Sequence, residues 1–118
     1  MDNKTFALEL EARTKRFATR VIKLSSRLPT STEGRVIRSQ LTKSGTSIGA
    51  NYREANRARS RADFINKIKI CESEASETCY WLEIVDGMKW VPEKRLIDIK
   101  DESDQLLRLF STIGKKYK

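Results

Sequence analysis

The side chains with the clearest chemical potential are cations spaced for one side of a helix. Steps of 3, 4, 3 and 4 residues separate Arg13, Arg16, Arg20, Lys23 and Arg27. Residues at these intervals share one helix face, so the spacing predicts a continuous basic ridge. Such a ridge binds a phosphate backbone through charge and counterion release, without reading base sequence.

A second, shorter basic ridge is predicted further along the chain. Intervals of four residues separate Arg53, Arg57 and Arg61. Few aromatic residues are interleaved with these arginines, which argues against base stacking along a single strand. The alternative for both ridges is a solvated surface, or one that pairs with acidic residues of another copy of the chain.

The whole chain carries a formal net charge of +8, unevenly distributed. Residues 1–61 hold 14 Lys/Arg against 5 Asp/Glu, a net of +9, and residues 62–118 hold 10 against 11, a net of −1. A basic half favours a nucleic-acid partner. One basic and one acidic side also favour head-to-tail association, which closes into a ring if the rotation permits. The acidic set is Glu72, Glu74, Glu77, Glu83, Asp98, Asp101, Glu102 and Asp104.

No catalytic or metal-binding constellation accompanies these charges. Bundle di-metal sites use Glu-x-x-His motifs, and the chain has Glu74-x-x-Glu77 but no histidine. Cys71 and Cys79 would lie about 12 Å apart along one helix, too far for a disulfide, and are expected to be buried apolar residues. We therefore expect a protein that is not an enzyme and uses no metal, cofactor or small-molecule substrate.

The elements that position these residues are expected to be helices. The 118 residues suit one domain, 1–118, and five Gly and two Pro are too few for an all-β fold. Apolar periodicity predicts helices over about 4–28, 32–58, 60–86 and 92–114. The short connections favour an all-α, antiparallel up-and-down four-helix bundle. Neither a membrane span nor a signal-peptide core is present in the sequence, so a cytoplasmic location is expected.

Local signals refine these boundaries. Thr30 with Glu33 is typical of a capping box, Ser60 with Asp63 predicts the start of the third helix, and Gly87 its C-terminal cap. Gly45 and Gly49 lie within the second helix, where they indicate either close approach of a neighbouring helix or subunit, or a break. The apolar stripe of the first helix is expected to comprise Phe6, Leu10, Phe17, Val21, Leu24 and Leu28.

The third helix and the segment after it carry more apolar surface than one core seam needs. Tyr80, Trp81, Ile84 and Trp90 fall partly off its stripe. We expect these four residues to form an oligomer interface. The alternative is a wider core stripe.

Motifs in the middle of the chain resemble a known bacterial family. They run from Ser44 to Ala55 (SGTSIGANYREA), then Ser60–Phe64, Glu74–Thr78 and Tyr80–Glu83. The sequence is similar to the four-helix-bundle proteins encoded in intervening sequences of 23S ribosomal RNA genes, and the resemblance covers nearly the whole chain.

The resemblance implies a four-helix protomer that assembles into a homopentameric ring. A related branch, the accessory proteins of diversity-generating retroelements, associates as a basic pentamer with a reverse transcriptase and nucleic acid. For the intervening-sequence branch no molecular role is established, and the family supplies no catalytic residue. The motif residues Ser47, Asn51, Glu54 and Glu77 are interpreted as buried or interfacial hydrogen-bonding groups that hold helix register.

Two hypotheses for function follow. The first is a non-enzymatic, ring-forming bundle that binds structured RNA through the two basic ridges. The alternative is a protein–protein scaffold, or an accessory subunit of a nucleic-acid enzyme, without nucleic-acid specificity of its own.

Overall fold

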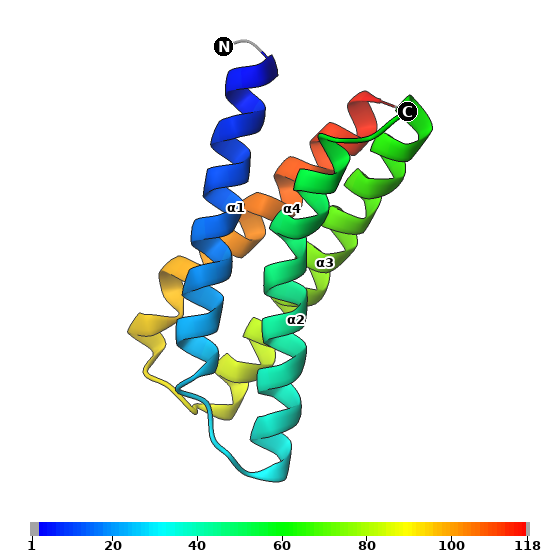
Figure 1. Cartoon of the computed structure of the whole chain (residues 1–118). Coiled ribbons are helices and arrows are strands. Elements are labelled where there is room, and N and C mark those ends of the chain that lie inside the picture. Colours follow the sequence, from blue (N-terminus) through cyan, green and yellow to red (C-terminus); the bar gives the residue numbers. More distant parts are fainter. Residues whose placement is uncertain (1–2, 118) are drawn as a thin grey trace.

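The computed structural model describes residues 3–117 and contains four α-helices in this range (Figure 1). They are α1 (Asn3–Ser25), α2 (Thr32–Ala55), α3 (Arg61–Met88) and α4 (Ile97–Lys116), with a short 3₁₀ helix, η1 (Glu93–Arg95), before α4. Consecutive helices run antiparallel in an up-and-down bundle measuring 44 × 26 × 20 Å. The predicted all-α four-helix bundle is confirmed.

The small residues at the centre of α2 let α1 approach closely. A Cβ atom added to Gly45 would lie 2.7 Å from a methyl carbon of Val21, and one added to Gly49 would lie 2.9 Å from Thr14 Oγ1. The helix is continuous through both glycines. The close-approach interpretation is therefore correct, the approaching helix is α1 of the same chain, and the alternative of a break is wrong.

The predicted apolar stripes largely form the core. Leu10, Phe17 and Val21 of α1 are buried, and Thr14 completes their row because its hydroxyl is satisfied by the Leu10 and Glu11 carbonyl oxygens. Phe6 is the exception, with 39% of its surface exposed. The N-terminal end of α1 stands apart from the other helices (Figure 1), which leaves Phe6 outside the core.

Of the two N-caps predicted from the sequence, one is confirmed and one is wrong. Ser60 caps α3 by accepting a hydrogen bond from the Asp63 N–H. The capping box at Thr30 is wrong, because Ser31 is the N-cap of α2 and its side chain accepts from the Gly34 N–H. Gly34 is required there because a side chain would collide with the Pro29 carbonyl.

Several predicted helix ends are also corrected. α1 ends at Ser25 and α2 at Ala55, each three residues before the predicted end, because the following turns tighten through i to i−3 hydrogen bonds. Gly87 lies inside α3, and Lys89 is the C-cap with a left-handed φ of 58°. Pro92 precedes η1 rather than standing in the first turn of α4.

Among residues 3–117, none of the helices has an apolar stretch of the length that a membrane span requires.

The four helices do not pack equally closely around the bundle. α1 packs mainly against α2, whereas its contact with α4 is small. A side-chain clamp from Arg13 joins α1 to α4.

Candidate nucleic-acid interface

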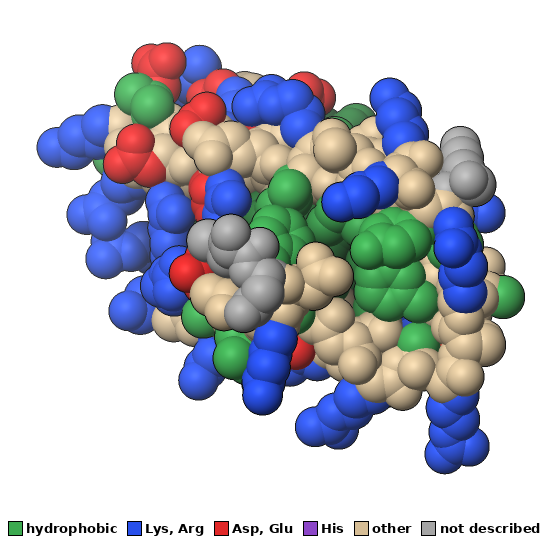
Figure 2. Space-filling view, turned by 90° about the horizontal axis from the view of Figure 1, so that it is seen from above, with side chains coloured by type: hydrophobic (Ala, Val, Ile, Leu, Met, Phe, Trp, Pro, Cys, Tyr) green, Lys and Arg blue, Asp and Glu red, His purple; other side chains and the backbone are tan. Residues whose placement is uncertain are grey.

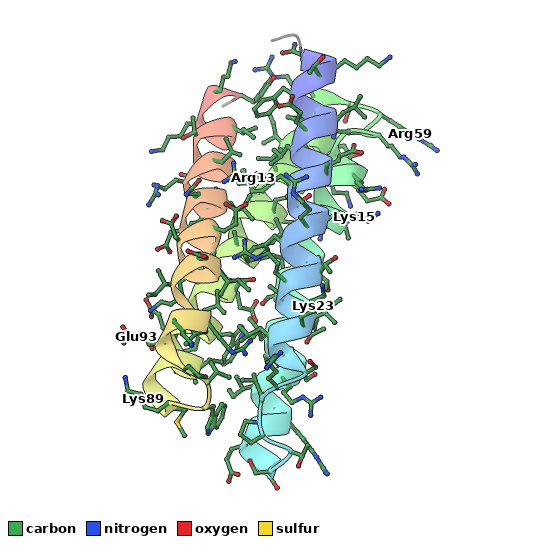
Figure 3. All side chains as sticks on the ribbon, turned by 90° about the vertical axis from the view of Figure 1, so that its left-hand side faces the viewer. Arg13, Lys15, Lys23, Arg59, Lys89 and Glu93 are labelled. Carbon is green, nitrogen blue, oxygen red and sulfur yellow. The ribbon has the colours of Figure 1, made fainter. Side chains whose placement is uncertain are left out.

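Arg13 does not belong to the exposed basic ridge. Its Nε lies 2.7 Å from Glu102 Oε2, and its Nη2 donates to Glu102 Oε1 at 2.8 Å and to Gln105 Oε1 at 2.9 Å. The hydrogen bond to Glu102 raises the pKa of Arg13 and holds the guanidinium charged. Figure 3 shows Arg13 between α1 and α4. We therefore remove Arg13 from the predicted phosphate-binding set, because three of its five N–H donors are occupied within the bundle and its charge is paired with Glu102.

The rest of the α1 ridge faces solvent. Two ion pairs join described side chains, Arg13 with Glu102 and Lys100 with Asp86, and neither involves the remaining residues of this ridge. Its members, Arg16, Arg20, Lys23 and Arg27, are all exposed. Arg16 to Lys23 cover about 10 Å of α1 at 1.5 Å per residue, and Arg27 lies in the turn after the helix. Since these side chains form no ion pair with the rest of residues 3–117, the strip presents positive charge to a polyanion.

The second predicted ridge is divided between elements. Arg53 lies in the last turn of α2, Arg57 in the following turn, and Arg61 begins α3, so the three do not share one helix. All are exposed. Arg61 Nη2 donates to the Tyr117 carbonyl at 3.3 Å, and its guanidinium lies 5.8 Å from the centre of the Tyr117 ring. These arginines form a cluster at one end of the bundle, not a continuous ridge.

A basic groove between α1 and α2 was missed by the sequence analysis. It is an open cavity of about 560 Å³ that combines three cations with four hydroxyls. Its polar lining is Arg35, Arg38, Lys43, Ser25, Ser26, Ser39 and Thr42. The hydroxyls of Ser25 and Thr42 lie 2.6 Å apart across the two helices. Cations and hydroxyls together are the groups that contact phosphate oxygens. The signal in the sequence was Arg35-x-x-Arg38 followed by Lys43.

Three of the four motif residues make hydrogen bonds within their own helices. Ser47 Oγ donates to the Lys43 carbonyl at 2.6 Å, and Asn51 Nδ2 to the Ser47 carbonyl at 2.8 Å. Glu77 accepts from Trp81 Nε1 at 3.2 Å. Glu54 is exposed and the other three are half-buried, so none is a buried group of the protomer. The interfacial interpretation of these residues stays a prediction.

The predicted oligomer residues separate into two groups. Trp81 and Trp90 pack partly against the core, as the wider-stripe alternative expected. Ile84 is half-buried, and Tyr80 is 52% exposed with its ring 5.0 Å from that of Trp81. Tyr80 thus remains an exposed aromatic residue on α3, joined on that helix by exposed Ile70.

Burial affects the ionisation of the two thiols and of one carboxyl group in the described part of the chain. No cluster of three or more metal-ligating side chains occurs among residues 3–117. Burial raises the pKa of the Cys71 thiol to about 12, and burial likewise raises the pKa of Cys79, which disfavours the nucleophilic thiolate at both. Burial and then the neighbouring Glu77 raise the pKa of Glu74.

Comparison with known proteins gives a consistent result. The family described as 23S rRNA-intervening sequence protein matches residues 7–112. A solved structure from Bacteroides thetaiotaomicron, described as a protein with unknown function from the S23 ribosomal protein family, is 39% identical, with a TM-score of 0.82. That match covers 89% of this chain and 97% of the other. No curated protein matches the chain.

Proposed function

The chain belongs to the 23S rRNA-intervening sequence protein family, and from that premise we propose that it is a non-enzymatic protein that binds structured RNA through α1 and α2 and assembles into a ring. The observation that carries the RNA-binding part is the set of exposed cations on α1 without ion-pair partners among the described residues. The groove formed by α1 and α2 supports it, since its cations and hydroxyls suit a phosphate backbone.

The test is RNA binding by a charge-reversal variant. Arg16→Glu, Arg20→Glu and Lys23→Glu together remove three exposed cations from α1. We measure anisotropy with a labelled structured RNA between about 50 and 200 mM salt. If each cation contacts one phosphate, the slope of log affinity against log salt should fall by roughly 0.7–0.9 per contact.

A matched control carries the same charge change elsewhere. Lys94→Glu, Arg95→Glu and Arg108→Glu alter exposed residues of η1 and α4. This control should retain the wild-type slope, since those residues lie outside α1 and α2. Equal weakening by both triple variants would mean that only net charge matters, and would refute a defined RNA surface. Wild-type binding that is lost for RNA and duplex DNA together by 200 mM salt would refute RNA preference.

Ring assembly is supported by the opposite charges of the two halves and by exposed apolar side chains on α3. Tyr80 and Ile70 are 52% and 39% exposed. Native mass spectrometry of the wild type and of Tyr80→Glu tests this part. We expect a single closed oligomer, five copies by family resemblance, that the variant disrupts. A wild-type monomer at micromolar concentration would refute the ring.

The scaffold alternative rests on the same exposed Tyr80. It predicts that the α1 charge reversal disrupts the oligomer while the wild type binds RNA no more tightly than any polyanion. Mass and anisotropy measured on the same samples distinguish the two functions.

A further inference from the structure

The end of the bundle that carries both described termini holds a cavity outside the basic surfaces already discussed. Its volume is about 470 Å³, within the usual range of small-molecule pockets. All four helices contribute to its lining because α1 diverges from the others there. Figure 2 views this end and shows apolar side chains open to solvent with Lys and Arg around them.

Aromatic rings form part of the wall, beside the aliphatic side chains of Ala7, Leu109 and Ile113. Phe6, Tyr52, Phe64 and Tyr117 all line the cavity. The rings of Phe64 and Tyr117 lie 5.2 Å apart in an edge-to-face pair, and both side chains are half-buried, so each remains partly open to the cavity. Planar side chains at the edge of a cavity suit a planar ligand, since nucleobases of any identity stack on them. These rings come from α1, α2, α3 and the residue that follows α4, so they are not neighbours in the sequence.

The rim is cationic and carries amide groups. Lys116 lines the cavity, and Arg61 lies against Tyr117 with its guanidinium 5.8 Å from the ring centre. Asn56, at the end of α2, lines the same space and donates from Nδ2 to Glu11 Oε2 at 2.9 Å. An aromatic wall beside fixed positive charge complements a planar ring linked to an anion. An aliphatic chain would gain from the apolar wall alone, whereas a nucleotide uses both features.

We propose that this cavity receives one unpaired nucleotide of the bound RNA, with its base against Phe64 and Tyr117 and its phosphate near Lys116 and Arg61. The inference rests on the proposed RNA-binding function and adds a defined subsite to it. The basic surfaces hold the backbone of the paired region, and the cavity selects RNA that offers an unpaired base within reach. Structured RNA with a bulge or an overhang is therefore preferred over a perfect duplex.

The experiment compares two RNA hairpins that differ at one position. One carries an unpaired 2-aminopurine nucleotide at its 3′ end, and the other carries an abasic nucleotide there. Stacking on aromatic side chains is expected to make the first hairpin bind about 5- to 150-fold more tightly, with quenching of the 2-aminopurine emission. Backbone charge is the same in both hairpins, so the ratio isolates the base.

Variants connect the ratio to the cavity. Phe64→Leu with Tyr117→Leu keeps apolar side chains but removes the planar rings, and should bring the ratio close to one. Leu8→Ala changes an exposed residue of α1 that does not line the cavity, and should leave the ratio unchanged. Circular dichroism and the unfolding midpoint confirm that each variant is folded.

The outcomes separate this inference from the function beneath it. Equal wild-type affinity for both hairpins overturns the nucleotide subsite while RNA binding stands, whereas binding to neither overturns both proposals. Displacement of the 2-aminopurine base by micromolar AMP would assign the cavity to free nucleotides and overturn the RNA assignment. A changed oligomer mass in the double Leu variant would make the cavity a contact between copies, which also overturns it.

Discussion

Replacing Gly45 with alanine tests the closest approach of α1 to α2. A Cβ atom at this position would lie 2.7 and 2.8 Å from the two methyl carbons of Val21 and 3.1 Å from its Cβ. Val21 is fully buried, and its branched Cβ permits few rotamers. Rotation of Val21 cannot move its Cβ away, so the added methyl group must push the two helices apart.

The size of the effect follows from two opposing contributions. Overpacking a core costs typically about 1–3 kcal/mol, and the crowding by three atoms of one rigid side chain places Gly45→Ala near 3 kcal/mol. Alanine's better helix propensity offsets about 1 kcal/mol. The net loss is therefore about 2 kcal/mol, or about 8 °C in Tm for a chain of this size.

The matched control is the same substitution at Gly87. This glycine is exposed within α3, and a Cβ there would meet no atom within 4 Å. Only helix propensity acts, so Gly87→Ala should stabilise the protein by about 1 kcal/mol. The same chemical change thus has opposite signs at two positions, and the sign depends on packing alone.

The assay is urea unfolding followed by circular dichroism at one fixed protomer concentration, because assembly shifts apparent stability. The variant Val21→Ala with Gly45→Ala completes a double-mutant cycle. Removing the Val21 methyls relieves the two closest contacts and leaves only the Val21 Cβ at 3.1 Å, so we expect a coupling of at least about 1 kcal/mol. Wild-type stability or better for Gly45→Ala, or strictly additive losses in the double variant, would refute the reasoning.

Three further predictions concern a cap, a thiol and a carboxyl group. Ser31→Ala should lower the free energy of unfolding by about 1 kcal/mol because Ser31 caps α2, whereas Thr30→Ala should change it by less than about 0.5 kcal/mol. Urea unfolding of both variants measures the two changes, and a larger loss for Thr30→Ala would contradict the assignment of Ser31 as the cap. Burial raises the pKa of Cys71 to about 12, so iodoacetamide at pH 8 should modify this thiol in urea but not in the folded protein, as mass spectrometry would show. Burial, followed by Glu77, raises the pKa of Glu74, so the folded state holds this proton to higher pH than the unfolded chain. Relative to Glu74→Gln, the wild type should lose stability as pH rises from about 4 to 7, and equal urea midpoint differences across that range would contradict this.

The core could be predicted because periodicity reports it directly. Val21, Ile48 and Val85 recur at helical intervals on their segments, and each is fully buried. The close approach at Gly45 and Gly49 was also predictable, because interior glycines destabilise a helix unless a neighbouring helix packs where their side chains would be.

Helix ends were less predictable because several residues offer the same signal. Thr30 and Ser31 are adjacent and can both cap a helix, and the choice depends on where the Pro29 carbonyl meets Gly34. Gly87 is the residue type that most often follows the last turn of a helix, yet α3 continues past it to Met88. The chain then turns so that Val91 and Leu96 are buried, with 9% and 1% of their surfaces exposed.

The candidate sites depended on contacts between distant segments. Arg13 has the correct spacing for the ridge, but its partner Glu102 lies 89 residues away, and no local pattern predicts that pair. The aromatic cavity has the same origin, since Phe6 and Tyr117 belong to opposite ends of the described chain. Exposed Arg16 and Arg20 were predictable because a cation without a nearby acidic partner remains in solvent.

The uneven closure of the bundle has a consequence for how the chain reaches its native state. Nearly all of the packing joins helices that are consecutive in the sequence, which is a low-contact-order topology and favours rapid folding. The hairpin of α1 and α2 can form before α3 and α4 have been synthesised, whereas α3 must wait for α4 to complete its own hairpin. The packing of α4 against α3 and the clamp from Arg13 to Glu102 must both wait for α4, so the last helix completes the fold during synthesis.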